Sequence, residues 1–203
     1  MSGRARTTAT WLGVGACAVY AAFAFDVGVD VLLSADAPAR SAPPLFVLHA
    51  FGGGIALVAG PLQLALAPRV LARATRLHRV LGRVYVGAAC VTAVAGLGTA
   101  VAFDVGLAGT LAFAAWALLW LGTTSAALVA VRRGRITRHR AWMVRSVALS
   151  LVFAVFSVVQ PALLDAGLGR AAAYPLAVLC SVALVLACSR IGLRGRAVAA
   201  AWQ

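Results

Sequence analysis

The chain has 203 residues, of which 63% are hydrophobic and only 11% are charged, and its mean hydropathy is +0.97. Soluble globular proteins are less apolar than this, so the composition excludes soluble enzymes, nucleic-acid binders and secreted disulfide scaffolds. The formal net charge of +13 comes from 18 arginines against five aspartates, and the positions of these charges indicate membrane topology rather than a polyanionic partner.

Six continuously apolar runs follow one another along the chain, at residues 10–33, 45–67, 80–103, 107–131, 143–164 and 172–190. Each is long enough for a transmembrane helix, which needs about 20 residues. Barrel strands would instead alternate polar and apolar residues in short segments. We therefore predict an all-α integral membrane protein, with a six-helix transmembrane bundle forming one membrane domain over residues 1–203. The first run also resembles a secretory signal, but it is longer than a typical signal core, so we take it as a span.

The arginines are concentrated on one side of this arrangement. Sixteen of them lie at the two chain ends and in the second and fourth connections. The opposite connections hold only Arg40 and Arg170, together with all five aspartates. By the positive-inside rule, the arginine-rich side is cytoplasmic. We expect a multi-pass protein of the bacterial cytoplasmic (inner) membrane with both termini inside.

His49 begins a face of small residues in the second span. Gly53 and Gly60 follow it at offsets of 4 and 11, which places them on the same helix face, and Pro61 and Gln63 come just beyond. Small residues allow membrane helices to approach closely. The pattern is consistent with a close helix crossing that holds one interfacial histidine. The alternative is a ligand-binding or proton-handling groove, including Gln63, that opens to the outside.

Two related segments enter the membrane from the arginine-rich side. Each has a His-Arg pair followed by another arginine within two turns: His78, Arg79, Arg83 and Tyr85 in the third span, and His139, Arg140 and Arg145 in the fifth. We expect the two imidazoles to lie close enough to share one cofactor or anionic head group. The alternative is that these residues anchor the helix ends and contact lipid phosphates.

The fifth span also carries a polar stripe. Its members share one helix face and are Ser146, Ser150, Ser157 and Gln160. Hydrogen bonds between helices would explain the stripe, and a quinone head-group site is the more specific alternative. Pro161 is expected to bend the outer end of this helix.

All four cysteines lie inside predicted spans without Cys-x-x-Cys spacing. Neither a zinc site nor a redox dithiol is indicated. We expect Cys17, Cys90, Cys180 and Cys188 to act as small packing residues.

Three motifs together resemble a known family. They are Leu48-His49-Ala50-Phe51-Gly52-Gly53 continuing to Gly60-Pro61-Leu62-Gln63, then His78-Arg79 with Gly82-Arg83-Val84-Tyr85, then His139-Arg140-Ala141-Trp142-Met143-Val144-Arg145-Ser146. Over about residues 45–160 the chain is similar to the bacterial predicted-membrane-protein family called domain of unknown function 2306. The resemblance implies the membrane fold and marks residues, but it supplies no reaction. A fainter similarity exists to four-helix b-type cytochromes, in which histidines on neighbouring spans hold haem.

Three functions are consistent with these patterns. The protein could transport or bind a small ligand, lipid or quinone within the bundle, with the bilayer and a quinone or anionic lipid as its partners. It could carry one b-type haem, with His78 and His139 as axial ligands to the iron and Arg79, Arg83, Arg140 or Arg145 pairing with the propionates. It could also be an accessory subunit that binds other membrane subunits and catalyses nothing.

The orientation can be tested directly. Reporters fused after Gln203 should report from the cytoplasm, and reporters inserted near Ala37 should report from outside, because the arginine asymmetry favours that orientation. A reporter after Gln203 that signals from outside would contradict the prediction.

Overall fold

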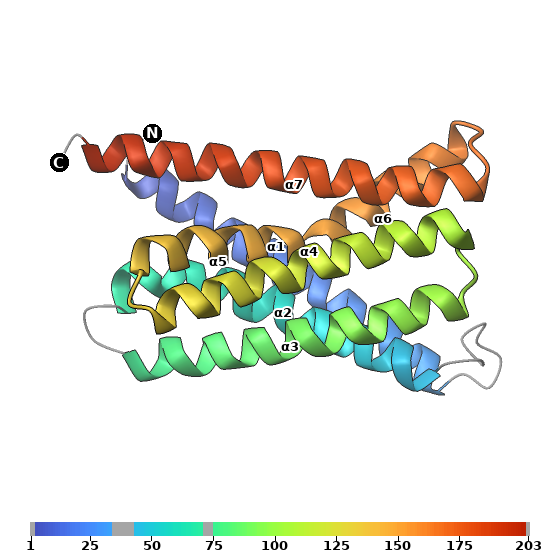
Figure 1. Ribbon diagram of the computed structural model, residues 1–203, viewed down its shortest axis with the longest axis horizontal. Coiled ribbons are helices and arrows are strands. Elements are labelled where there is room, and N and C mark those ends of the chain that lie inside the picture. The colour runs from blue at the N-terminus through green and yellow to red at the C-terminus, as the bar shows by residue number, and fades with distance from the viewer. Residues whose placement is uncertain (1–2, 34–42, 71–74, 202–203) are drawn as a thin grey trace. The chain divides into compact units, whose positions relative to one another are not determined.

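The computed structural model describes residues 3–33, 43–70 and 75–201, with side chains over 11–27, 29–30, 44–66 and 76–190. Seven helices account for most of this part of the chain (Figure 1). They are α1 (Gly3–Leu33), α2 (Pro43–Val70), α3 (Thr75–Ala102), α4 (Gly106–Arg132), α5 (Ile136–Ser150), α6 (Val152–Asp165) and α7 (Arg170–Ala201). The predicted all-α class is confirmed. Asp36, Arg40 and Arg73, which contribute to the predicted orientation, lie outside the described residues.

Five of the six predicted spans coincide with helical stretches long and apolar enough to cross a membrane. These stretches are Pro44–Leu66, Arg76–Ala102, Gly106–Arg132, Ile136–Asp165 and Arg170–Arg190. In α1 the side chains are described over residues 11–27 and 29–30, and the apolar stretch found within them is Trp11–Val27. The crossing at residues 10–33 therefore stays a prediction.

The helices form two compact units, Met1–Ala102 with α1 to α3 and Phe103–Gln203 with α4 to α7. In the first unit α2 packs against both α1 and α3. In the second, α4 packs against α5 and α7, and α6 packs against α7. Within each unit, successive spans run in alternate directions (Figure 1). That the whole chain forms one membrane domain stays a prediction.

Glycines end two helices of the second unit. Gly134 after α4 and Gly167 after α6 have φ values of 67° and 89°, a region that costs glycine little. In each turn the glycine N–H donates to the carbonyl three residues back, and the next N–H donates five residues back, from Arg135 to Ala130 and from Leu168 to Leu163. This Schellman pattern pairs carbonyls that a helix end leaves open.

Close contact between α2 and α3 depends on glycine. A Cβ added at Gly52 would lie 3.1 Å from Thr92 Cβ and 3.3 Å from Thr92 N. At Gly53 the nearest atom would be Thr92 Oγ1, at 3.4 Å, which is ordinary contact. The tightest approach to Thr92 on α3 is therefore at Gly52, one position before the glycine that the sequence pattern emphasises.

The cysteines do not all pack inside. Cys17 is half-buried, whereas Cys90, Cys180 and Cys188 are exposed. The expectation of packing residues is wrong for these three, because they lie on outward-facing helix positions.

Replacing Gly52 by Leu should lower the free energy of unfolding by about 1–3 kcal/mol, since the added side chain meets the α3 backbone. Folded yield and thermal stability in detergent measure the effect. Ile55→Leu is the matched control, because Ile55 is 40% exposed. If Gly52→Leu is tolerated as well as the control, the close contact with α3 does not exist.

Candidate functional site

The histidine at the arginine-rich end of the first unit, His78, meets a buried glutamine. Gln63 Nε2 of α2 lies 3.5 Å from His78 Nε2 of α3. The amide N–H can donate to this ring nitrogen when the nitrogen carries no proton. Gln63 is 4% exposed, and its Oε1 is buried without a hydrogen-bond partner among the described residues.

A glycine makes room for this amide. Gly82 follows His78 by one turn, and a Cβ there would lie 3.0 Å from Gln63 Nε2. Tyr85, on the same face of α3, is fully buried. His78, Gly82 and Tyr85 therefore form one face of α3, and its first two residues border the Gln63 amide.

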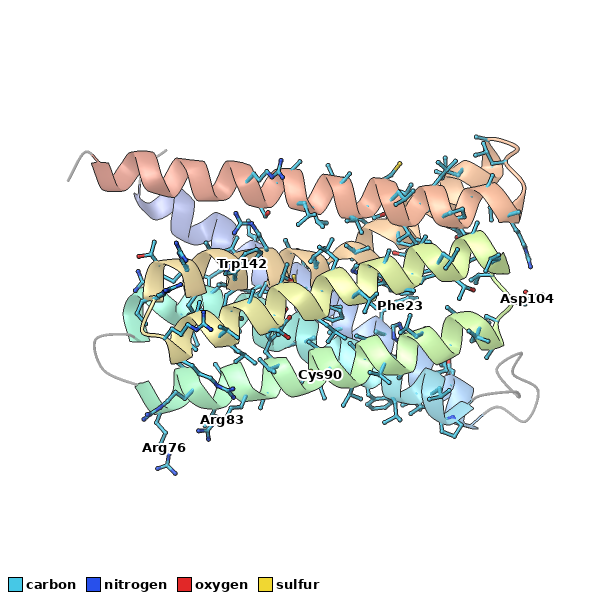
Figure 2. The ribbon with its side chains drawn as sticks, in the orientation of Figure 1. Phe23, Arg76, Arg83, Cys90, Asp104 and Trp142 are labelled. Carbon is cyan, nitrogen blue, oxygen red and sulfur yellow. The ribbon has the colours of Figure 1, made fainter. Side chains whose placement is uncertain are left out.

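The arginines lie on the adjoining face of α3. Arg76, Arg79 and Arg83 are exposed and recur at offsets of 3 and 7, so they share a stripe along the helix. Figure 2 shows the Arg76 and Arg83 side chains projecting away from the ribbon. The end of the α2–α3 pair thus combines a buried amide, a half-buried imidazole and exposed guanidinium groups.

The assignment of Gln63 to the outer groove is corrected. Gln63 lies fourteen residues beyond His49 on α2, which is about 21 Å along a helix at 1.5 Å per residue. It belongs with His78 at the opposite end of the helix pair. The sequence reasoning considered α2 alone and missed the partner helix.

His49 is held by α3 instead. Its Nδ1 lies 2.9 Å from the Thr92 carbonyl oxygen. Because a carbonyl can only accept, Nδ1 carries the proton. The Thr92 hydroxyl in turn donates to the His49 carbonyl over 2.6 Å. A Cβ at Gly96 would lie 2.7 Å from His49 Nδ1, so this glycine also makes room for the ring.

These contacts form a close helix crossing with an interfacial histidine. Gly60, eleven residues after His49 on α2, is buried. Sequence reasoning missed Thr92, because its role as the partner of His49 can be recognised only once α2 and α3 are placed side by side. A ligand bound by His49, Gly53 and Gly60 stays a prediction.

His139 lies in the second unit. Its Nδ1 is 2.9 Å from the Ala127 carbonyl oxygen of α4, so Nδ1 donates and a neutral ring has its lone pair on Nε2. Because His78 belongs to the first unit, a ligand shared between the two histidines stays a prediction.

The two arginines near His139 differ in their surroundings. Arg140 is exposed. Arg145 lies with its guanidinium carbon 5.0 Å from the centre of the Trp142 ring, a cation–π distance, and donates to the Ala141 carbonyl over 3.2 Å. Arg145 is thus held by its own helix, next to Trp142, which Figure 2 shows on α5.

The polar stripe is divided between α5 and α6, and its hydroxyls bond locally. Ser146 Oγ lies 2.7 Å from Thr124 Oγ1 of α4. Ser150 donates to the Val147 carbonyl and Ser157 to the Ala154 carbonyl, over 2.7 and 2.9 Å. Gln160 is half-buried. These contacts fit hydrogen bonding within and between helices, and a quinone site along the stripe stays a prediction.

The fifth span is interrupted at Leu151, ten residues before Pro161, while α6 continues through this proline to Asp165. The Leu151 N–H bonds to the Ala148 carbonyl, three residues back. The buried Trp116 indole donates to the Leu149 carbonyl over 3.1 Å. The backbone groups around the interruption are therefore hydrogen-bonded. Its position was not predicted, because the indole that bonds to the Leu149 carbonyl comes from another helix, α4.

Among the residues that the structure describes, no group of three or more histidine, cysteine or acidic side chains could hold a metal ion. A b-type haem needs only two axial ligands, so this observation does not bear on the haem hypothesis.

Comparison with known proteins gives one match. The sequence profile of a family described as predicted membrane protein (DUF2306) matches residues 46–189. Neither a curated protein nor a solved structure matches the chain.

Proposed function

The chain belongs to the DUF2306 family of predicted membrane proteins, and we propose that it binds the head group of a membrane lipid or quinone where Gln63 meets His78. The site would lie at the cytoplasmic surface of the bacterial inner membrane, with both chain termini on the same side. The arginine asymmetry of the sequence supports this orientation.

The unpaired amide oxygen carries the proposal. A buried polar atom without a hydrogen-bond partner costs about 1–3 kcal/mol. Gln63 Oε1 is such an atom within the described parts of the chain. A bound head group with a hydrogen-bond donor would remove this cost, so the protein has a physical reason to bind one.

The depth of the site also fits a head group. Along the sequence Gln63 is followed by Arg69 six residues later, and His78 lies between Arg76 and Arg79. Both side chains are therefore within two turns of arginines of the kind that flank spans, where head groups lie. The nearby Arg79 and Arg83 would hold a phosphate or a carbonyl oxygen.

A second candidate function is electron transfer through one b-type haem. His139 has the geometry of many metal ligands, because its Nδ1–H bonds to a carbonyl and so orients Nε2. Bound haem would supply one-electron redox chemistry. At His78, Nε2 faces the Gln63 amide, so ligation through that atom requires the amide to move. A Soret band lost in both His→Ala variants would favour haem over the head-group proposal.

Protein purified from bacterial membranes in mild detergent should retain about one lipid or quinone per chain, measured by mass spectrometry of extracts. The variants Gln63→Leu and Arg79→Gln/Arg83→Gln should each lower retention about fivefold to tenfold, as expected for one lost hydrogen bond or charge contact. Gln160→Leu and Arg132→Gln/Arg133→Gln are the matched controls. Equal retention by all variants would contradict the proposal.

A further inference from the structure

We infer that the site is specific for an anionic phospholipid whose head-group alcohol has free hydroxyls, as in phosphatidylglycerol. Its phosphate would pair with Arg79 and Arg83, and a glycerol hydroxyl would donate to Gln63 Oε1. This inference rests on the proposed function and names its ligand class.

The amide requires a donor from the ligand. The Gln63 amide has a donor and an acceptor: its N–H group faces His78, while its Oε1 has no hydrogen-bond partner in the part of the chain that the structure describes. Phosphate oxygens and the carbonyl oxygens of an oxidised quinone only accept hydrogen bonds, so they cannot pair with Oε1. Within the proposed function, a quinone would meet this requirement only in its reduced form, the quinol, which has hydroxyl donors. A hydroxyl donates, and glycerol brings two of them next to the phosphate.

The charges favour an anion. Arg76, Arg79 and Arg83 line the first turns of α3, and the first turn of this helix has no acidic residue. The acids with described side chains in this unit are Asp26 and Asp30, toward the end of α1. Ethanolamine would also offer donors, but it would bring an ammonium group to a site rich in guanidinium groups. Anionic lipids are attracted to such basic segments at the cytoplasmic surface.

The local geometry lets the lipid phosphate and the glycerol hydroxyl bind at the same time. His78 and Arg79 are consecutive, as are Gly82 and Arg83, so the arginines leave α3 about 100° around the helix from the face that borders Gln63, an angle that their long side chains would span. Gly82 has no side chain to fill the space beside the amide. The last torsion of a glutamine is soft, so binding of a hydroxyl to the buried Oε1 would be accompanied by a rotation of the amide that gives up the 3.5 Å contact between its Nε2 and His78.

Phosphatidylglycerol should be compared with phosphatidylpropanol, which has the same charge and the same number of head-group carbons but no free hydroxyl. The full-length protein in mild detergent is titrated with each lipid, with equal acyl chains, and bound lipid is counted by native mass spectrometry. Wild type should prefer phosphatidylglycerol about tenfold, the equivalent of one hydrogen bond. Gln63→Leu should bind both lipids equally, whereas Arg79→Gln/Arg83→Gln should weaken both.

The controls separate the two proposals. Gln160→Leu should keep the preference, and the thermal stability of each variant shows whether it is folded. Equal binding of both lipids by wild type, or a preference that survives in Gln63→Leu, overturns this inference. The proposed function still stands if the Arg79/Arg83 variant weakens lipid binding, or if a short-chain benzoquinol alone binds in a Gln63-dependent way. The proposed function fails if neither Gln63→Leu nor Arg79→Gln/Arg83→Gln changes the binding of phosphatidylglycerol, phosphatidylpropanol or the benzoquinol.

Discussion

The interior of a bilayer has no water, so each polar group on a membrane helix needs a partner from the protein or from another membrane component. Most buried side chains of this protein meet the requirement locally. The Thr124 and Ser150 hydroxyls bond to carbonyls of their own helices. His49 bonds to Thr92, and the Trp116 indole bonds to the Leu149 carbonyl. Among the described residues two buried atoms have no hydrogen-bond partner, Gln63 Oε1 and Ser181 Oγ. Of these, only Gln63 lies beside the exposed arginines of α3, and this combination locates the candidate site.

Small residues make these pairings possible. Gly96 gives space to the His49 ring, Gly82 gives space to the Gln63 amide, and Gly52 lets α2 approach Thr92. The same helix pair therefore places one histidine in a closed, mutually bonded crossing and the other beside an amide at the arginine-rich end. The His49–Thr92 contacts hold the two helices together. The His78–Gln63 contact leaves the glutamine oxygen able to accept a hydrogen bond next to the arginines.

The sequence was sufficient for the fold class and for the approximate limits of five spans, because continuous apolar runs and arginine-rich connections depend only on local composition. The partner of Gln63 depends on how two helices align. In an antiparallel hairpin, positions equally far from the 71–74 connection face each other, which pairs 49 with 96 and 63 with 82. Applied to α2 and α3, this rule would have placed Gln63 with the His78 turn. The interruption at Leu151 gives no such signal, because its indole partner comes from a different helix.

The central claim is that Gln63 lies with His78 rather than with His49. It is tested by paired cysteines in a chain from which the four native cysteines have been removed, using a short bifunctional thiol reagent in membranes. The account predicts rapid crosslinking of Gln63→Cys with His78→Cys. It predicts none for Gln63→Cys with Thr92→Cys, because Thr92 is on the same side of α3 but about four turns beyond His78. Crosslinking of the second pair and not the first would contradict the account.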